Sequence, residues 1–310
     1  MVPGVVLGRS RGGAGVVPGP CRAGPEGRAG VAPVDCPDNG GVPEGDTVYV
    51  LAQRLRPPLV GRRLVRAELR VPRHATENLA GRTVDAIDTH GKHLLTRLSG
   101  GLTLHTHLRM SGSWTVTGPG RRLPGRLMPQ VRVLLGVDSG ATAYGLDMPV
   151  VDLVATSREA ELVGHLGPDP LRPDWDAAEA ERRFLADPGR PLAAALLDQR
   201  VLAGLGNLWT NELCFLRGHS PWTPVGEVDV PRLVALAARA LRQSVSGPRT
   251  MQVTTGNTRP GEQHWVSGRA GQPCRRCGTT IRVVEEVPDD PERRRTWWCP
   301  SCQPGPGPDR

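Results

Sequence analysis

The side chain best suited to chemistry at a reacting centre is that of Lys92, in the stretch DTHGKHLLTRL (residues 88–98). It is the only lysine among the 39 basic residues, and every other one is arginine. Lysine is a compact point charge whose protonation responds to its surroundings, whereas the guanidinium of arginine stays charged. We therefore expect a functional ammonium group at residue 92. The alternative is the chance survival of one lysine.

Four of the seven cysteines form two C-x-x-C pairs near the C-terminus, Cys274–Cys277 and Cys299–Cys302. Four thiolates at this spacing are typical of a tetrahedral zinc site, and four sulfur ligands leave no position for water. We therefore predict one structural Zn²⁺, held at the open end of a β-hairpin. The alternative is an accidental cluster of cysteines. A unit of about 40 residues buries too little surface to fold alone, so the metal would stabilise it.

Three arginines, Arg293–Arg295, lie between the cysteine pairs in the stretch PERRRTWWC. A basic tip on a rigid metal-bound scaffold suits the backbone of a nucleic acid, although a solvated loop explains the same residues.

Composition points to the same class of partner. The net charge is +8 and the isoelectric point is near 9.7, which favours a polyanion, with nucleic acid ahead of an anionic membrane. A basic surface that binds nothing in particular is the alternative. No apolar run reaches the length of about 18 residues that a membrane span needs. The odd cysteine count and the clustered thiols favour a reduced cytoplasm and a metal over disulfides.

The first half of the chain reads mainly as strands. Alternating apolar residues in GLTLHTHLRM (residues 101–110) and PQVRVLLGV (residues 129–137) predict half-buried strands. The stretch DTVYVLAQRLRPPLVG (residues 46–61) instead has helical apolar spacing and is expected to end before the Pro57–Pro58 pair. One leading helix followed by antiparallel strands predicts a β-sandwich domain over residues 43–165.

The second half is predicted to be helical. Residues 166–175, LGPDPLRPDW, read as an interdomain linker because they are rich in proline. Helical segments follow over residues 176–250, and a four-cysteine unit covers residues 264–303. Residues 1–42 have neither helical nor strand periodicity and are expected to be a disordered extension.

A helix–turn–helix pattern lies within LDQRVLAGLGNLWTNELCF. The first helix is expected to end near Arg200, and the turn contains Gly204 and Gly206. The second helix is expected to open at Asn207, which is a good N-cap residue. Free amides at that helix start would form an anion site suited to a phosphate.

Several motifs occur together in one order: PEGDT (residues 43–47), HGKHLL, HLRMSGSW, GLGN followed by NE, and the terminal CPSCQ. In this combination the chain closely resembles the formamidopyrimidine-DNA glycosylase / endonuclease VIII family of base-excision repair enzymes. The similarity covers residues 43–303, and PEGDT is closer to the endonuclease VIII branch of bacteria. The resemblance implies an α+β fold with an N-terminal β-sandwich and flanking helix, a helix–two-turns–helix domain and a zinc-finger β-hairpin.

The resemblance implies three catalytic residues. Pro43 would be the N-terminal residue whose secondary amine attacks C1′ of the damaged nucleotide. Glu44 would protonate the sugar ring oxygen and later move protons; the alternative is a carboxylate favoured at a helix start by the macrodipole. Lys92 would contact the phosphate and sugar at the lesion and assist departure of the base. A guanidinium in its place would be bulkier and could not donate its proton.

It also implies DNA contacts. Asn207 would bind the phosphate beside the lesion, and Glu212 would orient the flipped nucleotide or its water. An ordinary polar helix residue is the alternative for Glu212.

Arg294 matches the finger arginine that grips the flanking phosphates, with Arg293 and Arg295 left open as neighbours. Met110 occupies the position of an apolar wedge that fills the space of the extruded base. A core methionine is the alternative for Met110.

The family chemistry needs Pro43 at the start of the chain, yet 42 residues precede it. A proline nitrogen inside a chain is an amide, whose lone pair is delocalised into the carbonyl and cannot form an iminium. Val42 comes directly before Pro43, and its GUG codon is a common alternative start in GC-rich bacteria. We therefore expect translation to begin at codon 42, with removal of the initiator methionine.

The sequence thus predicts a bifunctional DNA glycosylase and abasic-site lyase, cytoplasmic and monomeric, with damaged DNA as its partner. Oxidised pyrimidines are the expected substrates and oxidised purines the alternative. Some relatives have a second glutamate near the first, where this chain has Asp46 and Thr47, and this leaves the lesion preference open. The rival hypotheses are a non-catalytic DNA-binding zinc protein and an inactive long form.

Overall fold

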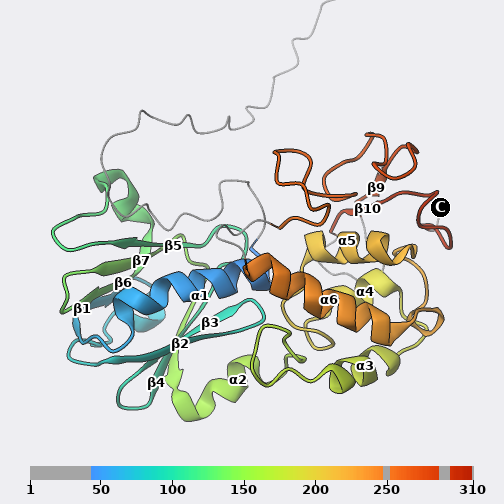
Figure 1. Ribbon diagram of the computed structural model, residues 1–310. Helices are drawn as coiled ribbons and strands as arrows, with labels where there is room; N and C mark the ends of the chain where they lie inside the picture. Colours follow the sequence, from blue (N-terminus) through green and yellow to red (C-terminus); the bar gives the residue numbers. More distant parts are fainter. Residues whose placement is uncertain (1–42, 247–251, 286–293, 309–310) are drawn as a thin grey trace, which may run out of the picture. The chain divides into compact units, whose positions relative to one another are not determined.

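The computed structural model describes residues 43–246, 252–285 and 294–308 (Figure 1). The expected extension over residues 1–42 and the side chain of Arg293 lie outside the described residues. Among the helices of the described part, none is long and apolar enough to cross a bilayer.

Two antiparallel four-stranded sheets form the predicted β-sandwich, which confirms the α+β class. The strand order is β1-β6-β7-β5 in one sheet and β2-β3-β4-β8 in the other. The strands are β1 Leu64–Leu69, β2 Val84–His90, β3 His93–Leu98, β4 Leu102–His107, β5 Ser113–Thr117, β6 Val131–Val137, β7 Thr142–Leu146 and β8 Val150–Ala155. The strands predicted in residues 101–110 and 129–137 are β4 and β6. In β4 both faces are largely buried, so the expected half-buried pattern underestimates its burial.

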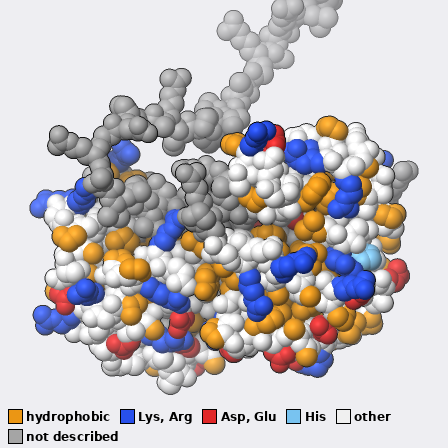
Figure 2. All heavy atoms as spheres, viewed as in Figure 1, with side chains coloured by type: hydrophobic (Ala, Val, Ile, Leu, Met, Phe, Trp, Pro, Cys, Tyr) orange, Lys and Arg blue, Asp and Glu red, His pale blue; other side chains and the backbone are white. Residues whose placement is uncertain are grey.

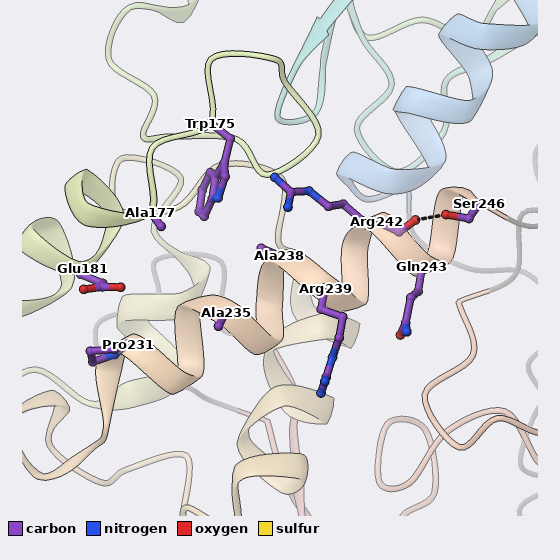
Figure 3. Close-up of a pocket in the computed structure, with 10 residues that line it drawn as sticks. All are labelled: Trp175, Ala177, Glu181, Pro231, Ala235, Ala238, Arg239, Arg242, Gln243 and Ser246. Carbon is purple, nitrogen blue, oxygen red and sulfur yellow. Dashed lines mark hydrogen bonds between the residues drawn. The ribbon is translucent and has the colours of Figure 1, made fainter.

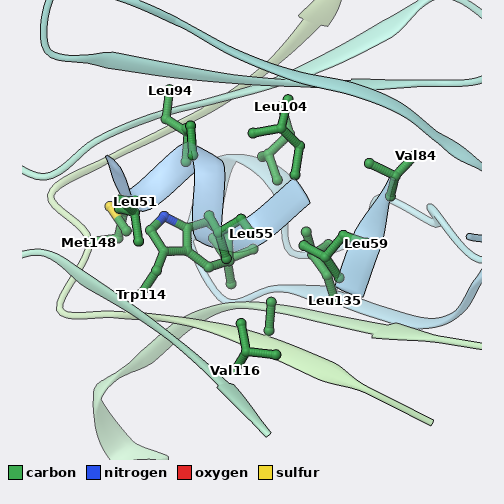
Figure 4. Close-up of a cluster of buried hydrophobic side chains, with 14 of the residues drawn as sticks. Leu51, Leu55, Leu59, Val84, Leu94, Leu104, Trp114, Val116, Leu135 and Met148 are labelled. Atoms are coloured by element: carbon green, nitrogen blue, oxygen red, sulfur yellow. The ribbon is translucent and has the colours of Figure 1, made fainter. Parts of the chain in front are cut away.

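Helix α1 (Gly45–Leu59) supplies one wall of the sandwich core. Leu51, Leu55 and Leu59 point from it into the space between the sheets, where they meet Trp114 of β5 and Leu104 of β4 (Figure 4). These side chains are almost fully buried, so their packing holds the helix against the strands.

The prediction that α1 ends before Pro57 is wrong. The helix includes Pro57 and Pro58 in its last turn and ends at Leu59. Each proline removes one backbone donor, but Leu59 is 1% exposed and the N–H of Val60 still donates to Arg56 O at 2.9 Å. Burial of Leu59 therefore outweighs the lost hydrogen bonds.

Five helices follow β8 in the described residues, and the short α2 precedes the segment over residues 166–175. Helix α6 packs against both α1 and α3 (Figure 1). The helices are α2 Glu159–Val163, α3 Ala177–Leu185, α4 Leu192–Leu197, α5 Asn207–Arg217 and α6 Val230–Val245, and the short 3₁₀ turns are Pro72–His74, Gly125–Gln130, Thr156–Arg158 and Val225–Glu227.

The helix expected to end near Arg200 stops earlier, at Leu197. Asp198 has extended backbone geometry, and its carboxylate accepts the N–H of Arg200 at 2.9 Å. A short acidic side chain that bonds the backbone two residues on competes with the helix, which explains the early end.

The C-terminal unit is a small hairpin of β9 (Arg282–Val284) and β10 (Thr296–Trp298). It packs on α5, where the N–H of Trp297 donates to Asn211 Oδ1 at 2.9 Å. Phe215 of α5 and Ile281 share a buried cluster with the cysteines.

Candidate active site and metal centre

Three glycine-containing segments meet at the start of α1. The N–H of Gly45 donates to Gly204 O at 2.8 Å. A Cβ at Gly45 would lie 2.6 Å from Gly204 Cα, and a Cβ at Gly91 would lie 3.2 Å from Gly204 N. Gly204 also has a φ of +100°, which favours glycine. The main chains of these segments therefore touch directly, and we call this contact the three-segment junction.

Glu44 lies at the junction with 0% of its surface exposed. Its carboxylate accepts the N–H groups of Gly206 at 2.7 Å and Leu208 at 2.8 Å, at the start of α5. These amides are therefore not free for a phosphate, and the prediction of an open anion site at this helix start is wrong. The acceptor there is a carboxylate of the protein itself, which a helix N-terminus favours.

The electrostatics of Glu44 suit proton transfer near neutral pH. Burial raises the pKa of Glu44 to about 7; the positive charge of Lys92 opposes the shift and the charge of Asp46 adds to it. A group with this pKa is present in both protonation states at pH 7 and can donate a proton and later accept one. Pro43 precedes it directly and is partly buried.

Lys92 lies in the turn between β2 and β3, close enough for its charge to act on Glu44. The preceding Gly91 has a φ of +55°, and its N–H donates to Asp169 Oδ2 at 2.7 Å. Asp169 is 3% exposed, and burial raises the pKa of its carboxyl. Asp169 thus fixes the Lys92 turn, a role that the sequence analysis missed.

The segment over residues 166–175, expected to be a linker, is partly buried. The N–H of Gly167 donates to Gln199 O, and the N–H of Ala203 donates to Pro168 O. Leu166 is 6% exposed. The proline-rich composition thus indicated an irregular segment but not that its backbone packs against the junction.

Asp46 is a second carboxylate that the sequence analysis left without a role. It is fully buried and accepts hydrogen bonds from Trp209 Nε1 at 3.0 Å, from the hydroxyl of Ser244 and from Gln252 Nε2 at 3.0 Å. It therefore joins α1 to α5, α6 and the segment after α6. An acidic residue in the first turn of a helix indicates only a favourable interaction with the helix dipole. The residues next to Asp46 in the sequence gave no indication of its distant hydrogen-bond partners.

Asn207 is the first residue of α5, and the N-cap is Gly206, so the expected N-cap role of Asn207 is wrong by one residue. Asn207 Nδ2 donates instead to Arg295 O at 2.9 Å. This bond holds the segment of Arg294 beside the start of α5. Arg294 is partly buried, whereas Arg295 is exposed and pairs with Glu285 at 3.0 Å.

Glu212 is fully buried, so the alternative of an ordinary polar helix residue does not hold. Its carboxylate accepts the N–H groups of Trp265, Val266 and Ser267 at 2.8–2.9 Å and the hydroxyl of Thr254. Glu212 therefore anchors the chain around residues 254 and 265–267.

Met110 is 72% exposed, which excludes the alternative of a core methionine. It follows Arg109, whose φ of +47° places it in the left-handed region. The large apolar side chain of Met110 is thus exposed to solvent at a tight turn.

The four predicted cysteines converge. Their sulfur atoms all lie within 4.8 Å of one another, with 3.9 Å between Cys274 and Cys302 and 3.5 Å between Cys277 and Cys299. The N–H groups of Arg276 and Cys302 donate to cluster sulfurs at 3.4 Å. The cluster can therefore hold one metal ion.

A separate groove of about 450 Å³ lies between α3 and α6 (Figure 3). Trp175, Arg239 and Arg242 are among its lining residues, and none of the predicted site residues is.

On the face shown in Figure 2, basic side chains are spread among apolar and uncharged ones over both the strand-rich and the helical half.

Comparison with known proteins identifies the class. Residues 42–148 match the formamidopyrimidine-DNA glycosylase N-terminal domain, and residues 166–254 match the formamidopyrimidine-DNA glycosylase H2TH domain. The fold is that of a formamidopyrimidine-DNA glycosylase from Lactococcus lactis solved with an oxidised-pyrimidine DNA, at a TM-score of 0.67 and 23% identity over 85% of this chain and all of that one.

Sequence relatives are closer. A probable endonuclease 8 2 of Streptomyces coelicolor is 50% identical over 86% of this chain and 96% of its own length. The DNA-(apurinic or apyrimidinic site) lyase Nei2 of Mycolicibacterium smegmatis is 44% identical over 84% of this chain and 99% of its own length. The chain belongs to the formamidopyrimidine-DNA glycosylase / endonuclease VIII family, which confirms the resemblance.

Proposed function

We propose that Pro43, with a free secondary amine, is the nucleophile of this protein and that Glu44 and Lys92 serve it. The protein is a DNA glycosylase and abasic-site lyase for oxidised bases, in line with its family. The observation that best supports the residue assignment is Glu44, which is buried next to Pro43, has a pKa of about 7 and feels the charge of Lys92.

The chemistry follows from these groups. The lone pair of Pro43 forms a bond to C1′, the bond from C1′ to the base breaks, and the base leaves with the bonding electrons and takes up the proton that the Pro43 nitrogen loses. Glu44 donates its proton to the ring oxygen as the C1′–O4′ bond opens, and an iminium between Pro43 and C1′ results. The iminium draws electrons and acidifies C2′, so loss of a C2′ proton expels the 3′ phosphate by elimination.

Lys92 is proposed to contact the phosphate and sugar at the lesion and to assist departure of the base. The ammonium lies near Glu44, so it also favours the carboxylate that remains after proton donation.

We further propose that the active chain begins at Pro43, because only a terminal proline has a lone pair free for attack. The match to the family model begins at residue 42, which supports this start. Mass spectrometry of the native protein is expected to show an N-terminal Pro43, and an active protein with an intact Met1 would contradict the proposal.

Borohydride trapping tests the nucleophile. Hydride reduces the iminium and leaves a covalent protein–DNA adduct on an abasic-site oligonucleotide. A chain that begins at Pro43 should form the adduct, whereas a matched chain with one glycine inserted before Pro43 should not. Absence of an adduct from the first chain, with DNA binding retained, would favour the rival of a non-catalytic DNA-binding zinc protein.

For DNA contacts we propose Asn207 and Arg294 at phosphates and Met110 as the wedge in the space of the extruded base. The bond from Asn207 to the segment of Arg294 supports a shared phosphate-binding role. The exposure of Met110 supports the wedge. Glu212 is proposed to hold the chain over residues 265–267 in place for the flipped nucleotide.

The metal proposed for the cysteine cluster is one structural Zn²⁺. Zinc–sulfur bonds of about 2.3 Å in a tetrahedron place sulfur atoms about 3.8 Å apart, and the separations of 3.5 and 3.9 Å fit this geometry. We expect one zinc per chain by elemental analysis.

We propose oxidised pyrimidines as the preferred lesions and a monomer as the working form. The similarity to a probable endonuclease 8 2 and to the DNA-(apurinic or apyrimidinic site) lyase Nei2 supports the pyrimidine preference. Single-turnover rates on defined pyrimidine and purine lesions test it, and faster removal of oxidised purines would overturn it.

A further inference from the structure

Beside the Lys92 turn, the sheet brings three histidines into one row. His90 of β2 pairs with His93 of β3, and His93 pairs with His107 of β4. In the next row His105 of β4 pairs with Asp152 of β8. Side chains two residues apart share a face of a sheet, so these residues lie on one face, opposite to that of the core residue Leu94.

Hydrogen bonds join three of these residues into a chain. His105 is 4% exposed; its Nδ1 lies 3.2 Å from Asp152 Oδ2, and its Nε2 lies 2.8 Å from His93 Nδ1. An ionised carboxylate only accepts hydrogen bonds, so Nδ1 of His105 carries its proton and Nε2 is the acceptor. Nδ1 of His93 must then donate, and Nε2 of His93 is left without a proton.

The row is built for neutral rings. His93 stacks on His105 with 5.0 Å between ring centroids and meets the edge of His107 at 4.8 Å and that of His165 at 6.4 Å. Burial lowers the pKa of His93 to about 2, and positive charge on the surrounding histidines would lower it further. Burial also lowers the pKa of His105, and Asp152 opposes that shift.

Each histidine of the row is tied to a segment next to the site. His93 directly follows Lys92. His107 Nδ1 accepts the N–H of Arg109 at 3.0 Å, directly before Met110. His90 Nε2 lies 3.0 Å from Gly167 O.

Other charged groups on or against this face are already paired in the described structure. Arg73 approaches Asp152 at 3.5 Å, and Arg97 bridges Asp88 and Glu159. The remaining titratable groups near the row are His74, whose Nε2 accepts the N–H of Leu153, His165, Asp169 and Arg172. The histidines are thus the groups on this face that proton uptake can switch from neutral to charged.

We propose that Asp152 and His105 are positioning residues, which hold His93 as the Nδ1–H tautomer and so fix the Lys92 turn and the Met110 turn for the reaction. This rests on the proposed function of Lys92. When the histidines of the row are protonated, their positive charges lie within about 5 Å of one another. The repulsion between these charges is strong in the low dielectric of a buried site, so the rings cannot keep their packed arrangement. Uptake of protons therefore releases both turns and lowers the rate in acid.

The tautomers can be measured without DNA. Nitrogen NMR of the imidazole rings in the chain that begins at Pro43 should show His93 and His105 both protonated at Nδ1, with no titration of His93 above pH 5. Asp152→Asn should shift His105 toward the Nε2–H tautomer. A proton on Nε2 of His93 in the unaltered protein would overturn the proposal.

The activity test uses the pH profile of adduct formation. His105→Phe keeps the stacked ring but removes both hydrogen bonds, so the acid limb should move up by about one pH unit and the rate on that limb should fall by about tenfold. Thr103→Val is the matched control, because Thr103 is buried on the same strand and face and loses hydrogen bonds to Thr156 and Glu159. Its acid limb should stay in place.

Coincident profiles for the two variants would reject the positioning role. Loss of adduct formation in the unaltered protein would instead reject the proposed function, while the NMR tautomers would remain as stated. If His105→Phe does not fold, the Asp152→Asn profile replaces it, since Asp152 keeps partial exposure.

Discussion

The three-segment junction and the cysteine cluster hold their geometry in different ways. At the junction, main chains touch at glycines and a buried Glu44 accepts two amides from 162 and 164 residues away. In the cluster, four sulfur atoms within 28 residues suit one metal ion. The geometry of the junction thus depends on the absence of side chains at its glycines and on the protonation state of Glu44. The geometry of the cluster depends on the proposed metal ion.

The largest effect should come from the proton on Glu44. Glu44→Gln removes the donor and should slow base release by about 10³-fold, the usual range for a lost general acid. Because its folded pKa is about 7, the protonated fraction falls as pH rises above 7, and the rate should fall with it.

Single-turnover kinetics from pH 5.5 to 8.5 measure both effects. In Glu44→Gln the limb above pH 7 should be absent. A variant with the unaltered pH profile would separate Glu44 from the proton transfer.

The close backbone contact predicts the next effect. Gly45→Ala would place a methyl group 2.6 Å from Gly204 Cα, so the free energy of unfolding should fall by about 3 kcal/mol. Urea unfolding measures this. Gly118→Ala is the control, because its Cβ would meet nothing within 4 Å, and it should change stability by less than about 0.5 kcal/mol. Equal stabilities for the two variants would argue against the contact.

Metal loss should act on DNA binding more than on the sandwich. Cys277→Ser removes one sulfur ligand, so the hairpin of β9 and β10 should loosen and DNA affinity should fall by about tenfold. Elemental analysis and fluorescence anisotropy measure the two results. Cys214→Ala is the control, since Cys214 lies outside the cluster and the metal content should stay at one. Unchanged metal in Cys277→Ser would contradict the assignment of the cluster.

The smallest effect distinguishes neighbouring arginines. Arg294→Ala should weaken DNA binding uniformly across sequences and reduce the salt slope of the affinity by about one. Arg295→Ala should change it less, because Arg295 already pairs with Glu285. The reverse order would move the phosphate contact to Arg295.

Short-range patterns in the sequence were enough to predict much of the fold and part of the site. The cysteine spacing predicted a cluster that the structure confirms, and alternation predicted β4 and β6. Local signals failed where a distant contact decides the outcome. Leu59 extends α1 through two prolines because it packs in the core, and the amides at the start of α5 bind Glu44 because the chain returns there.

The supporting carboxylates were missed for the same reason. Asp169 lies in a stretch whose composition indicates only a loop, yet it holds Gly91 across 78 residues of sequence. Burial, which the sequence did not reveal, excluded a core methionine at Met110 and an ordinary polar helix residue at Glu212, and the DNA contacts of both residues stay proposals.

The distance in sequence between Glu44 and its amide partners bears on synthesis at the ribosome. The segment with the proposed nucleophile emerges first, but the donors for Glu44 leave the exit tunnel only after Leu208 has been made. A nascent or truncated chain that ends before residue 206 therefore lacks the environment that tunes Glu44. The environment of Glu44 is therefore complete only once both halves of the chain have been made.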